Sequence, residues 1–561
     1  MKASKDNKEL QIINFKFDYI AIICICFFAF AIVEKTLQND TYYTIALGKQ
    51  VLSNWIDMKE HFSWHEGLIY TYPHWLYDIV IYLFYKTMGF NGVYISTVIL
   101  SIFLGIAFYY TTSKLSKNRL VSFIFTLAVL FFGRGYITAR AQLVSFILFI
   151  LEIYNIEQFI ATKRKRNVIG LIIIPIAIAN IHAAVFPVYF VFYLPYIAEY
   201  LIAVVYESDI VNKIFLKIDK ISLKRLTKKD DKRLIEKIEK IRKRIETNED
   251  RIEYRKQNIE ERKSKFSKIK IEKNNNVKWL ILIMIICIFT GLITPIGNTP
   301  YTYLYNTMKG NTTQNINEHL PIVLFNDKKA LIYIALIIFM ITFSKVKVKL
   351  SDLFLIAGVI FLTIVSRRQL SLLLFIGSIS VAKVLDEIFN IYDENGTYEM
   401  IKYATTIFGQ IIILALIGTM CILLLKNEKK NPIVNDSSYP VAASNFILEN
   451  LDISKLRMYN DYNYGSYLLY RGIPVFIDSR ADVYDPKFNG LEDDIFQDYI
   501  SITNLNCDYE KKFEHYKINY VMTYKDAKLN YGLSRDDNYK EIYSDKNFII
   551  YERLSAKIEN N

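Results

Sequence analysis

Cysteine is scarce in this 561-residue chain, and the few cysteines do not cluster. The five residues are widely separated in the sequence, at Cys24, Cys26, Cys287, Cys421 and Cys507. Four of them fall within apolar stretches, and none belongs to a group with the spacing of metal ligands. This distribution argues against a disulfide framework and against a structural zinc site.

A small-residue cleavage site is also missing after the first apolar block, which covers residues 17–33. The block follows a lysine-bearing start, as the apolar region of a secretory signal does. Without the cleavage site, we expect an uncleaved first membrane span.

Apolar and charged residues are both plentiful, at 52% and 22% of the chain, but they are segregated. The apolar residues form blocks long enough to cross a bilayer, and the charges lie between them. Residues 74–88 have helical apolar spacing interrupted by Asp78 and Lys86, which predicts an amphipathic helix in the membrane interface. Hydropathy predicts about eleven spans, at residues 17–33, 91–112, 120–133, 141–161, 168–181, 183–206, 277–294, 329–344, 351–365, 369–386 and 403–425.

The positions of Lys and Arg predict the orientation of these spans. With the N-terminus in the cytoplasm, four basic segments lie inside, as the positive-inside rule requires: residues 114–119, 162–166, 207–276 and 344–349. The acidic loop 387–402 and the basic segment 426–430 do not follow the rule. The C-terminus is then predicted outside the cell membrane. Because most of the +13 charge sits in these segments, it does not indicate nucleic-acid binding.

The segment 207–276 is predicted to be a basic helical insert between two halves of a membrane domain, 1–206 and 277–428. Apolar residues recur in it every seven positions, at Ile238, Ile245, Ile252, Ile259 and Phe266. This pattern favours a solvated helical hairpin that neutralises anionic lipid headgroups. A coiled coil that binds a partner protein is the alternative. Interleaved acidic residues argue against nucleic acid.

Residues 429–561 change to a pattern of short strands and helices. A helix is expected from Pro440 to Glu449, and a second one within residues 464–472. Strands are expected at residues 457–461, 474–478, 520–524 and 547–553. The alternation predicts a small α/β domain with a partly parallel sheet outside the membrane.

Polar residues that could take part in catalysis or in binding gather on the predicted outer side. The long first outer loop, 34–75, contains Asp40 and His74, and other outer segments contribute Arg134, Arg140, His182, Glu318, Arg367 and Arg368. Arginines at membrane depth are costly unless they face a polar cavity or a phosphate, which they bind with paired hydrogen bonds. A carboxylate beside phosphate-binding arginines is what sugar transfer from a lipid phosphate needs. Asp40 would deprotonate the acceptor hydroxyl, and the arginines would stabilise the departing phosphate.

Each of these residues also has a structural interpretation. Asp40 is a favourable N-cap for the helix that follows. Arg134 and Arg140 would serve as interfacial anchors. His182 would bond to the backbone at a tight turn between two spans, and His74 with Trp75 would form part of an aromatic belt.

No set of residues has metal-ligand spacing. Asp40 lacks a neighbouring acid, and His61 and His65, which would share one face of a helix, have no third ligand. In the C-terminal domain Asp461, Asp478, Arg480 and Asp482 either bind an acceptor sugar or form an internal ion-pair network at strand ends.

Several stretches resemble bacterial membrane glycosyltransferases of the GT-C class, which include protein mannosyltransferases and the lipid A aminoarabinose transferase. The matching stretches are DTYYTIALGKQVLSN, HFSW, HWLYDIVIYLFYK, RAQLVSFILFILEIY, ANIHAAVFPVY, TPIGN, EHLP and SRRQLSLLLFIG. YNDYNYGSYLLYRGIPVFIDSRADVY is similar to the C-terminal domain of an uncharacterised subgroup. The resemblance covers most of the chain except the insert.

This resemblance implies an undecaprenyl-phosphate-linked sugar donor, a cavity at the outer membrane face and a catalytic acid in the first outer loop, where Asp40 matches. Proline turns expected near Asp57 and Met58 are missing, and so is a second acid to complete a metal-binding pair. The resemblance therefore does not support a divalent metal, and no other cofactor is expected.

The sequence thus predicts a multi-pass cell-membrane glycosyltransferase that uses a polyprenyl-phosphate donor and a glycan, lipid or protein acceptor. The alternatives are a lipid-linked glycan polymerase or ligase, a flippase, and a non-catalytic membrane scaffold. A flippase would show charged or broken helices near mid-membrane and an internal repeat, neither of which is clear in the sequence.

Overall fold

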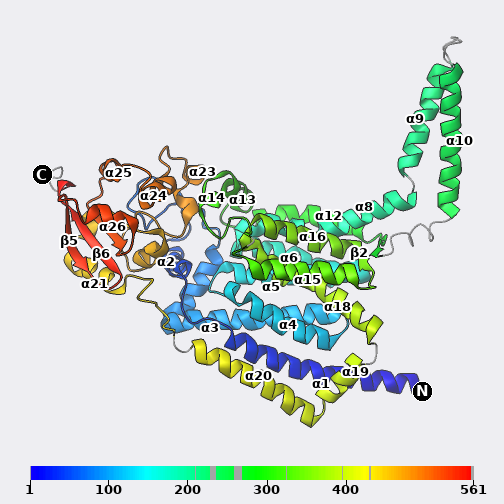
Figure 1. Ribbon diagram of the computed structural model, residues 1–561, viewed down its shortest axis with the longest axis horizontal. Coiled ribbons are helices and arrows are strands. Elements are labelled where there is room, and N and C mark those ends of the chain that lie inside the picture. Colours follow the sequence, from blue (N-terminus) through cyan, green and yellow to red (C-terminus); the bar gives the residue numbers. More distant parts are fainter. Residues whose placement is uncertain are drawn as a thin grey trace.

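The computed structural model is mainly helical and has three parts (Figure 1). A bundle of long helices lies in the middle, a helical hairpin projects beyond one end, and a smaller α/β domain covers the other end (Figure 1). The described residues are 2–208, 210–227, 235–257, 268–323, 325–393, 396–428 and 431–556. The predicted mainly α class is confirmed.

Six helical stretches within the described ranges are long and apolar enough to cross a membrane. They are formed by α1 (Lys2–Ala31), α3 (Trp75–Leu115), α4 (Arg119–Gly133) with η1 (Arg134–Tyr136), α5 (Ala141–Thr162), η2 (Ala183–Val185) with α7 (Phe186–Val191) and α8 (Leu194–Ser208), and α20 (Ile407–Glu428). Two shorter apolar stretches are α12 (Val277–Ile288) with η4 (Phe289–Leu292), and α16 (Leu350–Val365).

The other three predicted spans are helical but short or broken. They coincide with α6 (Lys165–Ile181), with α15 (Lys328–Phe343), and with the series η5 (Arg367–Gln369), α17 (Leu370–Leu372), η6 (Leu373–Gly377) and α18 (Ser378–Tyr392). A further helix, α19 (Gly396–Ala404), precedes α20. The count of eleven membrane crossings therefore stays a prediction.

The predicted interfacial helix and the span after it form one element, α3. A kink separates them at Gly89, whose backbone angles are φ 60° and ψ −149°. This left-handed φ suits glycine, which has no Cβ to clash with the backbone. The amphipathic first part can therefore change direction before the apolar part begins.

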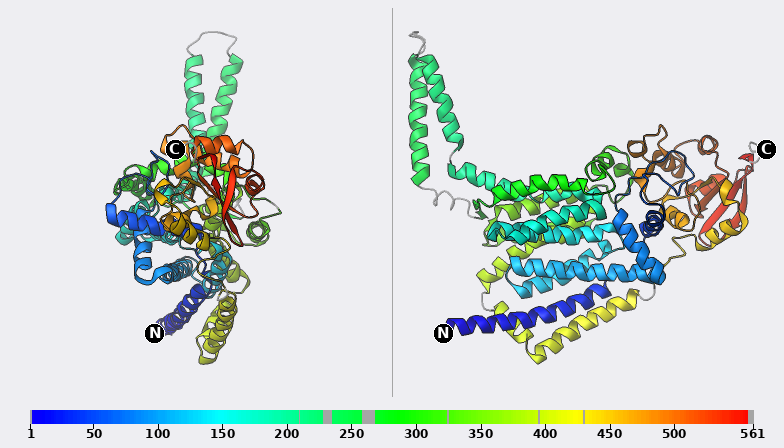
Figure 2. Two further views of the ribbon diagram at one scale, coloured as in Figure 1. Left: turned by 90° about the vertical axis from the view of Figure 1, so that its left-hand side faces the viewer. Right: turned by 180° about the vertical axis from the view of Figure 1, so that it is seen from behind.

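The insert forms the predicted antiparallel hairpin, from α9 (Ile210–Leu226) and α10 (Ile235–Gln257) (Figure 2). Ile241 is buried against α9, and Ile238, Ile245 and Ile252 are half-buried on the same face of α10. Ile259 and Phe266 lie outside the described residues, so the coiled-coil interpretation stays a prediction. A short parallel pair, β1 (Ile269–Lys270) with β2 (Val348–Lys349), joins the end of the insert to the bundle.

The C-terminal domain contains a four-stranded sheet in the order β3-β4-β6-β5. The strands are β3 (Met458–Tyr459), β4 (Tyr520–Tyr524), β5 (Tyr539–Ser544) and β6 (Phe548–Arg553). β3 pairs parallel with β4, and the other pairs are antiparallel, so the predicted partly parallel sheet is confirmed. The helices are α21 (Val441–Asn450), η7 (Ile453–Lys455), α22 (Tyr462–Tyr470), η8 (Ala481–Tyr484), α23 (Pro486–Asn489), α24 (Ile495–Thr503), α25 (Tyr509–His515) and α26 (Lys528–Leu533).

The predicted strand at residues 474–478 is wrong. This segment does not join the sheet; its single bridge pairs Val475 with Ser63 of the first outer loop. The amide of Phe476 donates to the side chain of Asn460 instead of to a neighbouring strand. An apolar run forms a strand only where a partner lies alongside it, and here the partner is a loop from a distant part of the sequence.

The first outer loop and the C-terminal domain share two hydrophobic cores. One core contains Leu47 and Tyr70 of the loop together with Phe476, and the other contains Tyr42 together with Tyr439. The loop includes α2 (Asn39–Asn54), so this helix is packed between the bundle and the domain (Figure 1). Burial of each large apolar side chain contributes about 2 kcal/mol, so the shared cores stabilise the contact between the loop and the domain.

Candidate active site

A polar cavity of about 350 Å³ opens at the end of the bundle that carries the C-terminal domain. Its lining comes from four segments of the chain: the residue before α2, the connection from η1 to α5, the loop at residues 317–327, and residues 367–368. The lining residues are Gln38, Gly135, Tyr136, Thr138, Arg140, Gln142, Asn317, Glu318, Asp327, Arg367 and Arg368. Four residues predicted for the site, namely Arg140, Glu318, Arg367 and Arg368, therefore meet here.

Arg140 holds two carboxylates at the edge of the cavity. It immediately precedes α5, and its Nε lies 3.1 Å from Oδ2 of Asp40, while its Nη1 lies 3.6 Å from Oε2 of Glu318. Burial would lower the pKa of Arg140, but these two carboxylates outweigh burial and raise it, so the guanidinium stays charged. Asp40 is thus beside the predicted arginine set.

Asp40 does not cap α2. The helix begins at Asn39 with Gln38 as its N-cap residue, and Asp40 lies within the first turn. A carboxylate in the first turn still gains from the positive end of the helix dipole. The capping interpretation is therefore wrong, and the side chain of Asp40 is free to contact Arg140.

Arg367 and Arg368 enter the cavity from η5, where the chain passes from α16 to α17. Their amides donate to the carbonyls of Leu320 and Glu318, which fixes the loop before α15 against η5. Arg367 Nε also donates to Oδ2 of Asp327 at 3.0 Å. The sequence showed no charge near these arginines, because Asp327 is 40 positions away in the chain.

Arg368 differs from the other two arginines in its partner. Its Nη1 lies 3.5 Å from Nε2 of His319. Burial, together with the charge of Arg368, lowers the pKa of His319 to about 4, so the imidazole is neutral at pH 7. Within the described ranges Arg368 forms no ion pair with a carboxylate, so its charge is available to an anionic ligand.

Four of the residues predicted for the membrane-domain site do not line this cavity in the described part of the chain. One is Asp40, which contacts the lining residue Arg140 but is not itself part of the lining. Arg134 is exposed and stacks on Phe131, 5.0 Å from the ring centroid. His74 Nδ1 contacts both carboxylate oxygens of Asp78 at 2.9 Å. His182 is buried, with its Nδ1 2.7 Å from the hydroxyl of Ser145, so its partner is a side chain and not the backbone of the turn.

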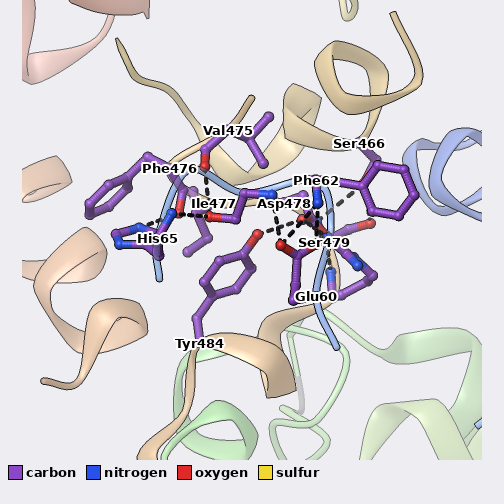
Figure 3. Close-up of polar contacts among 12 residues, drawn as sticks. Glu60, Phe62, His65, Ser466, Val475, Phe476, Ile477, Asp478, Ser479 and Tyr484 are labelled. Carbon is purple, nitrogen blue, oxygen red and sulfur yellow. Dashed lines mark hydrogen bonds and ion pairs between the residues drawn. The ribbon is translucent and has the colours of Figure 1, made fainter. Parts of the chain in front are cut away.

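In the C-terminal domain, Asp478 and Arg480 lie in a buried ion-pair network with Glu60 of the first outer loop. Figure 3 shows Glu60 and Asp478 close to each other, with Tyr484 beside Asp478. Arg480 Nη2 lies 2.7 Å from Oδ2 of Asp478 and 2.7 Å from Oε1 of Glu60, and Tyr484 donates to Asp478 at 2.5 Å. The backbone amides of Phe62 and Ser63 donate to Glu60. For Asp478 and Arg480, this arrangement is the internal ion-pair network that the sequence offered as the alternative to binding an acceptor sugar.

Asp461 and Asp482 are outside that network. Asp461 is the N-cap residue of α22 and accepts from the hydroxyl of Tyr499 at 3.0 Å. Asp482 accepts from Tyr303 of α13 (Thr299–Lys309) and from Thr312 of α14 (Thr312–Asn315). Asp482 thus connects the domain to the segment that leads to Glu318.

His61 and His65 lie in an irregular loop and not on one helix face, which corrects that expectation. His61 pairs with Asp57 at 2.8 Å, and Nε2 of His65 lies 3.0 Å from the carbonyl oxygen of Phe476 (Figure 3 shows His65). No group of three or more His, Cys, Asp or Glu side chains among the described residues is arranged to hold a metal ion.

Comparison with known proteins finds solved structures that share the fold of this chain. No protein-family model and no curated protein matches the sequence. The oligosaccharyltransferase of Archaeoglobus fulgidus in its apo form has a similar structure, with a TM-score of 0.54, 10% identity, and alignment over 90% of this chain and 69% of that one.

Two further structures of that archaeal enzyme AglB match with a TM-score of 0.51 and 11% identity, over 96% of this chain and 74% of theirs. One is tethered to an acceptor peptide with an NVT sequon, and the other holds an inhibitory peptide and a dolichol-phosphate. At such low identity the likeness shows a shared fold, in agreement with the expected GT-C-like membrane architecture.

Proposed function

We propose that the protein transfers a sugar from a polyprenyl-phosphate-linked donor to an acceptor at the outer face of the cell membrane. The observation that carries the proposal is the convergence of Arg140, Arg367 and Arg368 on one cavity beside Asp40. Three guanidinium groups from two distant segments line this cavity, and a cluster of this kind would suit an anionic ligand.

The arginines would bind the phosphate of the donor and stabilise the charge that develops on it. Arg368 is the group whose charge is not neutralised by an ion pair within the described structure, so it would make the first contact. A bound phosphate would then compete with Asp40 for Arg140, because both are anions that pair with the same guanidinium group.

Asp40, released in this way, would accept the proton of an acceptor hydroxyl or amide. The acceptor atom would attack the anomeric carbon of the sugar as the bond from that carbon to the phosphate oxygen breaks. The lipid phosphate would leave with the bonding electrons, held by Arg367 and Arg368. The archaeal structure with dolichol-phosphate and the one with an acceptor peptide support a lipid phosphate and a protein acceptor as the first candidates to test.

Purified protein tests this assignment in two assays. Binding of undecaprenyl phosphate should be lost in Arg367→Gln/Arg368→Gln and retained in Asp40→Asn. Transfer from a panel of polyprenyl-phosphate-linked hexoses to membrane acceptors should fall about 10²- to 10⁴-fold in Asp40→Asn, the usual contribution of a general base.

Glu66→Gln is the matched control, because Glu66 is an exposed carboxylate in the same outer loop. It should bind and transfer like the wild type. Full transfer activity in Asp40→Asn would remove Asp40 from the mechanism. Equal binding of undecaprenyl phosphate and undecaprenol by the wild type would argue against a phosphate site.

A further inference from the structure

The α9–α10 hairpin runs across the direction of the membrane helices, beyond the end opposite the C-terminal domain (Figure 1). In Figure 1 and in the reverse view of Figure 2, α9 lies on the side facing the bundle and α10 on the far side. In the chain, α9 follows α8, the last helix of the first half of the bundle. A bilayer that surrounds the bundle would therefore extend alongside α9 and not alongside α10.

The two helices of the hairpin differ in charge. α9 carries five basic residues and one acidic residue, Asp219, whereas α10 carries eight basic and six acidic residues. Asp219 is turned toward α10, where its Oδ1 lies 2.7 Å from Arg244. The remaining surface of α9 therefore presents positive charge without an acidic side chain of its own.

α9 also has an apolar stripe on the face that α10 does not cover. Ile214, Phe215, Ile218 and Ile221 are 52%, 56%, 52% and 46% exposed. The spacing of these positions puts them on one side of a helix. Asp219 and the half-buried Leu216 and Leu223 occupy the other side, toward α10.

Lysines follow one edge of this stripe. Lys213, Lys217 and Lys224 are exposed and recur at helical spacing beside the isoleucines. An apolar stripe with lysines along its edge is the pattern of helices that lie in the interface of an anionic membrane. The apolar side chains reach the acyl boundary while the lysine ammonium groups stay at the headgroup phosphates.

We propose that α9 is a membrane-surface anchor that docks on the anionic lipid bilayer beside the bundle. Ile214, Phe215, Ile218 and Ile221 enter the interface, and Lys213, Lys217 and Lys224 pair with lipid phosphates. The mixed-charge helix α10 covers α9 from the aqueous side. This assignment is independent of the sugar-transfer chemistry, because it uses none of the cavity residues.

A spin label on the full-length protein tests the docking in vesicles of 70% phosphatidylcholine and 30% phosphatidylglycerol. The label is placed at Ile218→Cys, and at Lys243→Cys on α10 as the matched control. Lys243 is exposed and lies two positions from Ile241 and Ile245, on the side of α10 away from α9. Wild-type protein with its native cysteines, treated in parallel, provides the background.

The label at residue 218 should be reached by oxygen dissolved in lipid and shielded from a water-soluble nickel chelate. The label at residue 243 should show the opposite preference. Replacing Lys213, Lys217 and Lys224 by Gln should lower the ratio of docked to undocked label at residue 218 by on the order of 100-fold, since each lysine near an anionic surface contributes about a factor of 5.

Equal exposure of residues 218 and 243 to the nickel chelate would overturn the proposal. Shielding from the nickel chelate together with low accessibility to oxygen at residue 218 would also overturn it, because that result would mark contact with a protein and not with a membrane. An unchanged docked fraction in the triple lysine variant would show that pairing of these lysines with anionic lipid does not drive the docking, which contradicts the proposal.

Discussion

At the scale of single residues, the cavity is a site whose charges nearly balance. Asp40, Glu318 and Asp327 face Arg140 and Arg367, and Arg368 is left with the neutral imidazole of His319. Paired charges of this kind can stay ordered without a ligand and can still exchange a carboxylate for a phosphate. The neutrality of His319 is part of that balance, because a second positive charge next to Arg368 would repel it.

The lowered pKa of His319 predicts a loss of stability on acidification. An unfolded histidine binds a proton below about pH 6.5, whereas folded His319 does so only near pH 4. The unfolded state therefore binds more protons in this window, and stability falls as the pH drops from 6.5 to 4. Because the side chain is partly exposed, we expect wild type to lose about 1–2 kcal/mol relative to His319→Gln.

Thermal unfolding of both proteins in detergent at pH 7 and at pH 4.5 measures this difference. The variant should be less sensitive to acid than the wild type. Identical pH profiles for the two proteins would show that His319 already titrates at its ordinary pKa.

At the scale of elements, the first outer loop belongs structurally to the C-terminal domain. Glu60 of the loop and Arg480 of the domain form an ion pair in which both side chains are almost fully buried. Ser63 bridges to Val475, and the indole of Trp64 donates to the carbonyl of Met458 at 3.1 Å. The domain thus fixes the far end of the loop that begins with α2 and Asp40.

Breaking the buried pair should destabilise both elements together. Arg480→Met leaves the carboxylates of Glu60 and Asp478 buried without their cation, which costs about 3–5 kcal/mol. The melting temperature of the purified protein should fall by several degrees, and protease should cleave the first outer loop sooner. Glu60→Gln/Arg480→Met should cost less than the sum of the single changes, because the partners act as a unit.

Lys487→Met provides the control, since Lys487 is an exposed cation in the same domain. It should change stability by less than about 0.5 kcal/mol. A melting temperature of Arg480→Met equal to that of the control would contradict the role assigned to the pair.

At the scale of the whole molecule, the two ends of the bundle differ in character. One end carries the first outer loop and the C-terminal domain, and the other carries the N-terminus and the basic hairpin (Figure 1). The residues that line the arginine cavity belong to the first of these ends. This separation matches the orientation in the membrane that the basic segments predict. Which end faces the cytoplasm stays a prediction.

Cysteine labelling in intact cells tests that prediction. With Cys507 replaced by Ser, a membrane-impermeant maleimide should label Glu66→Cys and Lys487→Cys on the outer side. It should label Lys117→Cys and Lys243→Cys only after the cells are opened, because the positive-inside rule places these segments in the cytoplasm. Labelling of residues 66 and 487 from opposite sides of the membrane would contradict the packing of the first outer loop against the C-terminal domain.

The sequence by itself determined the membrane-spanning class, the helical insert, most strands of the C-terminal domain and the arginines of the cavity. These features depend on local apolar runs, on heptad spacing and on the cost of placing charge near a membrane. The tertiary structure alone decided that Asp40 pairs with Arg140, that Asp327 reaches Arg367, and that residues 474–478 pair with a loop. Those contacts join residues from 40 to more than 400 positions apart, and only the packing of the whole chain brings them within bonding distance.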